Sequence, residues 1–411
     1  MYRLENPVRH YAWGSRAHIP RLLGVPADDR PWAELWLGAH PSAPSRVVGD
    51  GTLDDLIADD PARHLGERLH ATFGDRLPFL MKLLAAAEPL SLQVHPTSER
   101  ARIRHAEQDA AGIPLDAPER SYPDASHKPE LIYALTRFEG MAGFRDPAKT
   151  AAILRGLQLT WADEIADTIE DSATPFQTMR AVVTDLLSLR GQQLGHRLQQ
   201  LRAAAAAAEI RLHATFAGRR SSATPTDPTA IERESVRVYA ATTGLVDHYP
   251  EDPGVLVTLL LNHVVLAPGE AMFIDAGVIH AYTSGFGVEI MAASDNVLRA
   301  GLTPKHVDVP ELLEVTNFTP MPPPLWAADS DPRSTVLSPP VAEFELVVRS
   351  LDEPATLPAT AQVVLCLEGT VEVAAAGGTE TLVAGDSVFV GATDGEISLR
   401  GPGRVAVGRT P

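Results

Sequence analysis

Residues 254–294 constrain the fold more than any other stretch of this chain. Their sequence, GVLVTLLLNHVVLAPGEAMFIDAGVIHAYTSGFGVEIMAAS, alternates short apolar runs with Pro-Gly and Gly turns. This pattern is typical of a strand meander that builds a small antiparallel barrel. The turn-strand unit PGEAMFIDA at 268–276 recurs as AGDSVFVGA at 384–392, which predicts a duplicated barrel. Only the first copy is followed by a histidine, His280, so if the two barrels are related, only the first can bind a metal through that histidine.

The rest of the chain divides into β-like and helical segments. Residues 1–147 hold short β-like runs broken by Gly, Pro and Asp, whereas 148–227 show helical periodicity and much Ala, Leu, Gln and Arg. A loop is expected at GRRSSATPTDPT, 218–229, and one more helix at 230–243. The sequence therefore predicts a mainly β fold with an α insertion, made of two antiparallel β-barrel or jelly-roll modules and a helical domain.

The expected domain boundaries follow these changes in composition. They are 1–147 and 228–318 for a discontinuous catalytic β domain, 148–227 for the helical insertion, 319–340 for a Pro-rich connection and 341–411 for a C-terminal β domain without metal.

Charge and cysteine content exclude several classes of protein. A formal charge of −18 argues against a nucleic-acid binder, which needs a basic face, but leaves room for a small basic pocket that binds an anionic metabolite. Cys366 is the only cysteine, so an internal disulfide and a cysteine-built metal site are excluded. Neither a signal core nor an apolar run of bilayer length is present, so we expect a cytoplasmic protein with no membrane partner.

Polar residues interrupt three of the β-like segments. Gln93 and His95 in LSLQVHPTS would point to the same face of a strand, either as a hydrogen-bonded core pair or as ligands. Further candidate donors are Glu130 in SHKPE and His280 in GVIHAY. Such N and O donors suit zinc, although a histidine on a strand is often a core residue, so the residues alone leave both interpretations open.

Long segments of the chain closely resemble the type I phosphomannose isomerases. These segments are YAWGS (11–15), ELWLGAHPSAPS (34–45), LPFLMKLLAAAEPLSLQVHP (77–96), AAGIPLDAPERSYPDASHKPELIYALTRFEGMAGFR (110–145) and VEIMAASDNVLRAGLTPKHVDVPELLEV (288–315). The family comprises zinc enzymes of the cupin superfamily, so the resemblance implies two cupin-like modules, of which the C-terminal one lacks metal. It also implies interconversion of D-mannose 6-phosphate and D-fructose 6-phosphate through an enediol or enediolate.

The resemblance further implies roles for individual residues. One zinc ion per chain would be bound by Gln93, His95, Glu130 and His280. Arg299 falls on the catalytic position, and Lys128 is either a proton donor and acceptor or a structural partner of Glu130. The expected substrate-binding residues are Trp13, Lys82, Ser91, His127, Tyr282, Asp295 and Lys305.

Several alternatives stay open at this stage. The proton-shuttling base could be Lys128, a zinc-bound water, His127 or Asp295, and Trp13 could belong to the core. An iron-dependent cupin oxygenase is disfavoured by the glutamine ligand, because such sites use two histidines and a carboxylate. The second alternative is a non-catalytic sugar-phosphate-binding cupin with structural zinc, which would need neither Arg299 nor Lys128. A small sugar phosphate is the expected partner, without nucleic acid, and the chain is expected to be a monomer.

Overall fold

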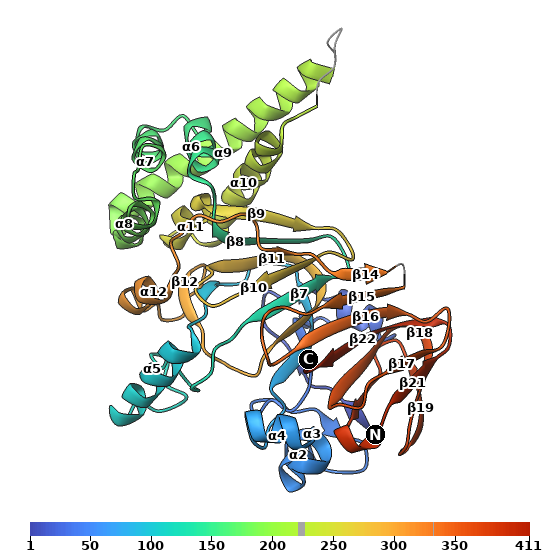
Figure 1. Cartoon of the computed structure of the whole chain (residues 1–411). Coiled ribbons are helices and arrows are strands. Elements are labelled where there is room, and N and C mark those ends of the chain that lie inside the picture. Colours follow the sequence, from blue (N-terminus) through green and yellow to red (C-terminus); the bar gives the residue numbers. More distant parts are fainter. Residues whose placement is uncertain (221–226, 332) are drawn as a thin grey trace.

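Two antiparallel sheets and a group of helices make up the protein (Figure 1). The structure is a computed structural model that describes residues 1–220, 227–331 and 333–411. The helices between residues 147 and 248, green to yellow in Figure 1, lie together at one end of the first sheet. The prediction of a mainly β protein with helices inserted is confirmed.

The first sheet carries the segments in which the candidate ligands lie. Its main path runs through β13 (Leu325–Trp326), β10 (Ala271–Ile274), β7 (Glu130–Ala134), β11 (His280–Ala292), β5 (Phe79–Ala86), β3 (Glu34–Leu37) and β2 (Val8–Arg9). Four more strands join it, namely β6 (Leu92–Val94), β8 (Phe138–Phe144), β9 (Leu261–Leu266) and β12 (Leu298–Gly301).

Strand β11 is the centre of this sheet because it changes partners along its length. From His280 to Ser284 it pairs with β6 and β8, and from Gly285 onward it pairs with β5 and β7. The change falls at Gly285, which has a φ of +126° and where an added Cβ atom would come within 2.7 Å of Phe138. A glycine at this bend therefore allows one strand to link both parts of the sheet.

The second sheet is formed mostly by the C-terminal part of the chain. Its main path is β14 (Asp329–Asp331), β15 (Ser334–Leu337), β16 (Glu345–Ser350), β22 (Gly403–Arg409), β18 (Gln362–Ala375), β20 (Ser387–Val390), β1 (Tyr2–Glu5) and β4 (Arg46–Val47). Strands β17 (Ala355–Leu357), β19 (Gly378–Val383) and β21 (Ile397–Arg400) complete it.

The N-terminal strand β1 belongs to this second sheet, whereas the expected boundaries assigned it to the first β domain. Tyr2 lies opposite Phe389, so β1 extends the C-terminal sheet beyond β20. The expected connection at 319–340 also contains strands, because β13 pairs with β10 of the first sheet and β15 pairs with β16 of the second. The domain boundaries themselves stay a prediction.

The turn glycine of the repeated turn-strand unit has a similar φ angle in both copies. The glycines before β10 and β20, Gly269 and Gly385, have φ values of +96° and +93°, which favour glycine. The meander as a whole starts later than expected, because 254–260 form α11 (Gly254–Val257) and the 3-10 helix η1 (Thr258–Leu260). The expectation of a strand there was wrong, since a short buried apolar run has no period that separates strand from helix.

The helical group also runs further than the expected insertion. It comprises α6 (Pro147–Gly156), α7 (Thr160–Glu170), α8 (Pro175–Ser188), α9 (Gly191–Arg220) and α10 (Ala230–His248). The loop expected at 218–229 falls mainly on 221–226, outside the described residues, and its first three residues are helical. Helix α10 begins with a capping box between Thr229 and Glu232. Fully buried Arg145 anchors α10 to the first sheet through Glu234, 2.7 Å away, and through the Leu259 carbonyl.

The remaining helices lie elsewhere in the chain. They are α1 (His18–Leu22), α2 (Leu53–Asp59), α3 (Pro61–Leu65), α4 (Glu67–Phe73), α5 (Ser98–Ala110), α12 (Val309–Val315) and the 3-10 helix η2 (Ala392–Asp394). Within the described part of the chain, no helix combines the length and the apolar character needed to cross a bilayer.

An apolar core between the two sheets fixes the strands that carry the candidate site. It joins Met81 and Ile290 of the first sheet to Leu346 and Phe389 of the second. Because side chains alternate along a strand, the neighbours of Met81 and Ile290 point to the other face of the first sheet. Lys82 of β5 is one such neighbour, and the candidate site lies on that face.

Candidate metal centre and active site

Three side chains from separate strands converge at one end of the first sheet. His95 follows β6, whereas Glu130 and His280 begin β7 and β11. The nitrogen Nε2 of His95 lies 3.2 Å from Glu130 Oε2, and Nε2 of His280 lies 2.8 Å from Glu130 Oε1. All three side chains are buried, and their candidate donor atoms lie within 4.8 Å of one another. A metal ion can therefore be bound by all three.

Hydrogen bonds to backbone carbonyls orient both imidazole rings. His95 Nδ1 lies 2.8 Å from the Asn296 carbonyl oxygen, and His280 Nδ1 lies 2.9 Å from that of Val278. A ring nitrogen facing a carbonyl carries the hydrogen, so Nε2 keeps its lone pair for a metal. Burial, followed by the charge of Lys128, lowers the pKa of His95 to about 4, which keeps this ring neutral near pH 7.

Gln93 lies beside the three donors. It pairs with His280 across β6 and β11, and its side-chain nitrogen is 3.3 Å from His280 Nε2. A half-turn of the amide exchanges its nitrogen for its oxygen, which would direct the oxygen at the same point. Two neutral imidazoles, one carboxylate and one amide oxygen form a donor set that fits zinc.

Lys128 contacts the same cluster. Its Nζ lies 2.6 Å from Glu130 Oε2 and 3.4 Å from His95 Nε2. Burial alone would raise the pKa of Glu130, but the nearby charge of Lys128 above all holds it well below its usual value. The hydroxyl of Tyr282 donates to Glu130 Oε1 at 3.1 Å, so the carboxylate is hydrogen-bonded on both oxygens.

A cavity of about 480 Å³ opens next to this cluster and collects most of the expected substrate-binding residues. The expected residues that line it are Trp13, Lys82, Ser91, Gln93, Lys128, Glu130, Tyr282, Asp295, Arg299 and Lys305. His127 is the one expected substrate-binding residue that does not line it, and its ring lies 2.7 Å from Glu343 of the C-terminal segment. Adjacent residues of an extended segment face opposite ways, so Lys128 meets the cavity and His127 does not. Its position does not support the expected role in substrate binding.

Two cations of the cavity have free side chains. Arg299 of β12 lies opposite Gln93, half-buried, and Lys305 is exposed four residues beyond that strand. Burial lowers the pKa of Arg299, while partial burial and the nearby charge of Arg299 lower that of Lys305. Among the described residues neither side chain forms a hydrogen bond or ion pair. These two groups can therefore bind an anion without first breaking a contact.

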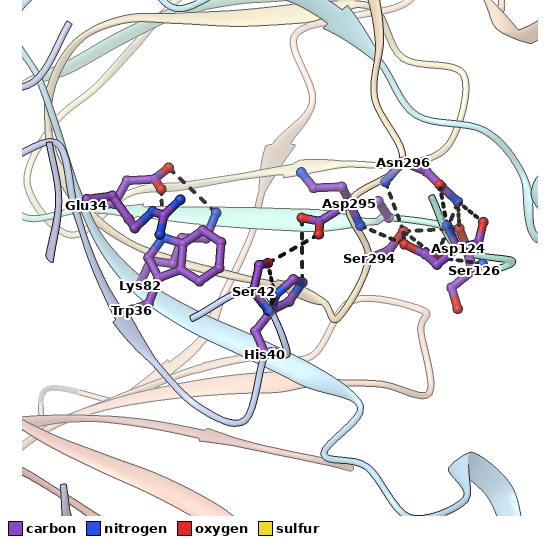
Figure 2. A network of polar contacts seen from close by, with 12 residues as sticks. Glu34, Trp36, His40, Ser42, Lys82, Asp124, Ser126, Ser294, Asp295 and Asn296 are labelled. Atoms are coloured by element: carbon purple, nitrogen blue, oxygen red, sulfur yellow. Dashed lines mark hydrogen bonds and ion pairs between the residues drawn. The ribbon is translucent and has the colours of Figure 1, made fainter. Parts of the chain in front are cut away.

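Lys82 belongs to a charged group that the sequence did not reveal. Its Nζ lies 3.6 Å from Glu34 of β3 and over the ring of Trp36 (Figure 2). The same Nζ lies 3.2 Å from Glu289 of β11. Although burial disfavours the charge, the two carboxylates raise the pKa of Lys82. Burial raises the pKa of Glu289. The only sequence signal was one acidic residue within each apolar run, WAELWLG and FGVEIM.

Known proteins share this architecture over the whole chain. A family model, "Phosphomannose isomerase type I, catalytic domain", matches residues 1–147. Mannose-6-phosphate isomerase of Escherichia coli (strain K12) is 35% identical over 415 residues, which cover 99% of this chain and 98% of that protein. The Homo sapiens enzyme is 32% identical over 432 residues, covering 97% of this chain and 95% of that protein.

Solved structures agree with the sequence comparison. A single-residue variant of phosphomannose isomerase from Salmonella typhimurium has a TM-score of 0.87 at 34% identity, covering 100% of this chain and 99% of that one. A zinc-bound mannose 6-phosphate isomerase has a TM-score of 0.85 at 34% identity, with the same coverage. The chain therefore belongs to the type I phosphomannose isomerase family.

Proposed function

We propose that this chain is a zinc-dependent aldose–ketose isomerase that interconverts D-mannose 6-phosphate and D-fructose 6-phosphate. The observation that carries the proposal is that Arg299 and Lys305, which have no partner among the described residues, line a cavity that is also lined by Gln93 and Glu130. A sugar phosphate has the two features this arrangement requires, namely a dianion and a chain of oxygen atoms. Family membership supports the same reaction.

We assign the cations of the cavity to different ends of the substrate, the phosphate end and the C1–C2 end. Lys82 is already held between two buried carboxylates, so it is poorly available for a phosphate dianion. Lys305 is exposed and forms no ion pair with any described residue, and an ammonium binds phosphate as a compact point charge. We therefore assign the phosphate to Lys305. Arg299, opposite Gln93, is assigned to the oxygens on C1 and C2.

The reaction moves the hydrogen on C2 to C1 and a proton from the C2 hydroxyl to the C1 oxygen. Gln93, His95, Glu130 and His280 would hold the zinc ion, which supplies a Lewis acid next to the sugar's carbonyl and hydroxyl oxygens. Because only one of these side chains is anionic, the centre keeps a positive charge that favours an anionic intermediate. Arg299 donates hydrogen bonds to the oxygens on which that negative charge develops.

The geometry narrows the choice of base. Lys128 and Asp295 line the cavity, whereas the ring of His127 lies against Glu343. A base must come within hydrogen-bond reach of the proton it removes, so Lys128 and Asp295 are the side-chain candidates. The hydrogen bond of Lys128 to Glu130 also fits a structural partner, and the two roles predict different kinetics. A Lys128→Ala variant that binds zinc but loses turnover supports the catalytic role.

The finer assignment of the fold accompanies this proposal. We infer that the two sheets are two cupin-like modules, each with the turn-strand unit before β10 or β20, and that the helices from α6 to α10 form an inserted helical domain. The first module binds the metal and the second does not. A monomeric state, a cytoplasmic location and the absence of a nucleic-acid partner stay predictions.

A coupled assay with mannose 6-phosphate tests the proposal. Purified protein should form fructose 6-phosphate, lose this activity when a chelator strips the metal, and regain it when zinc is added. If zinc-loaded protein is inactive and chelation only lowers its melting temperature, the metal is structural. The chain would then be a sugar-phosphate-binding protein of the same family.

A further inference from the structure

Two irregular segments, 122–129 and 293–297, lead directly into the candidate site. The first ends at β7 with Glu130, and the second ends at β12 with Arg299 one residue inside the strand. Neither segment forms a strand ladder of its own. Backbone hydrogen bonds at Ala293 and Pro129 hold one end of each segment. Side chains bind the backbone groups further along, because buried backbone groups need hydrogen-bond partners.

Asn296 provides one half of this fixation. It is fully buried, and its side-chain nitrogen donates to the carbonyl oxygens of Asp124 at 2.8 Å and Ser126 at 2.7 Å (Figure 2). Its side-chain oxygen accepts the backbone N–H of Asp124 at 3.3 Å. A single amide thus binds three backbone groups of the facing segment.

Asp124 provides the other half, in the opposite direction. Its carboxylate accepts the hydroxyl of Ser294 at 2.9 Å and the backbone N–H of Asp295 at 2.8 Å (Figure 2). It also accepts the backbone N–H of Ser126 at 2.8 Å, which fixes its own segment. Each segment therefore supplies a side chain that hydrogen-bonds the backbone of the other.

The backbone carbonyl of Asn296 makes the contact that matters for a metal. It accepts the hydrogen bond from His95 Nδ1 at 2.8 Å, and this bond sets the orientation of the ring. The carbonyl can hold the ring only where its own segment is held, and the Asn296 amide holds it. One residue thus connects His95, the segment before Glu130 and the segment before Arg299.

We propose that Asn296 is a positioning residue of the metal centre, which fixes His95 through its carbonyl and the 122–129 segment through its amide. This inference rests on the proposed zinc binding, and it goes further by naming a residue outside the donor set. Loss of such supporting contacts typically weakens metal binding by about 10- to 100-fold.

The test compares Asn296→Ala with Gln362→Ala as a matched control. Gln362 is also fully buried, and its amide donates to the carbonyl oxygens of Pro358 and Thr360, but it lies in the second sheet. The zinc dissociation constant is measured by competition with a chelator, and the melting temperature is measured on metal-free protein. Asn296→Ala should weaken zinc binding about 10- to 100-fold. Gln362→Ala should lower the melting temperature and leave the zinc dissociation constant unchanged.

Asp124→Asn supplies a second variant, which keeps the size of the side chain and removes the charged acceptor. It should weaken zinc binding in the same direction by a smaller factor, and it carries the test if Asn296→Ala does not fold. The absorption spectrum of cobalt-substituted protein should change in both variants, since it reports ligand geometry. Equal zinc affinity in wild type and Asn296→Ala, or equal weakening in Gln362→Ala, would overturn the inference. A wild type that binds no zinc would instead refute the proposed function.

Discussion

Replacing Lys82 with methionine removes the ammonium that lies between two buried carboxylates. Its Nζ is 3.2 Å from Glu289 and 3.6 Å from Glu34, and all three side chains are less than a tenth exposed. At an effective dielectric constant of about 20, an ion pair at 3.2 Å is worth roughly 5 kcal/mol before the cost of desolvation. Breaking a buried pair typically costs about 3–5 kcal/mol, because a charge is left without a partner. We expect a loss of that size in the free energy of unfolding at neutral pH.

The loss should depend on pH in a definite direction. Burial already raises the pKa of Glu289, and without Lys82 this pKa rises further. A carboxyl whose folded pKa is raised contributes stability below its unfolded pKa and loses it as the pH rises through the folded pKa. Lys82→Met should therefore be least destabilising near about pH 4.5 and most destabilising near about pH 8.

Urea denaturation at several pH values provides the measurement. Lys149→Met is the control, because Lys149 is exposed and should change stability by less than about 0.5 kcal/mol. A double variant, Lys82→Met with Glu289→Gln, should recover part of the loss, since a neutral amide needs no ionic partner. If Lys82→Met stays within about 1 kcal/mol of wild type at every pH, the reasoning from buried charge is refuted.

Three further predictions concern the cavity and the contact between His127 and Glu343. Arg299→Ala should bind zinc normally and lose about 10²- to 10³-fold in kcat, the usual effect of removing a donor to developing negative charge; unchanged kcat in the coupled assay would contradict its assigned role. Lys305→Met should raise the KM for mannose 6-phosphate about tenfold and weaken inhibition by inorganic phosphate, while kcat changes little. Lys149→Met is the control. A loss confined to kcat would mean that the phosphate binds elsewhere. His127→Gln should lower the free energy of unfolding by no more than about 1 kcal/mol, because the ring of His127 pairs with Glu343. It should leave kcat and KM unchanged, and a large loss of turnover would return His127 to the active site.

The electrostatics of the cavity differ from those of the whole molecule. The chain carries a formal charge of −18, yet its cavity presents Arg299 and Lys305 without partners among the described residues. The cavity is not basic overall, because Glu34, Glu88, Glu130, Glu289 and Asp295 also line it. A negative surface repels polyanions such as nucleic acid, whereas two cations that have no partner among the described residues can still bind one phosphate. Net charge therefore predicts the class of partner less well than the few charges that line the cavity.

Local sequence determined much of the fold. The helical segments from α6 to α9, the strands β7, β10 and β11, and the two glycine turns are encoded by neighbouring residues, through periodicity and turn chemistry. The four expected zinc ligands came from a resemblance to a family, not from spacing, and the structure brings three of them within 4.8 Å of one another with Gln93 beside His280. Their role in binding zinc stays a prediction.

Tertiary structure decided what neighbouring residues do not encode. Strand β1 pairs with β20, placing Tyr2 opposite Phe389, and no local period specifies a partner so distant in the chain. The same reason explains why Glu34, Glu289 and Asn296 were missed, since each is one polar residue in an apolar or irregular segment. Periodicity reports which face of an element is buried, but a buried charge or amide is stabilised only by groups that folding brings to it.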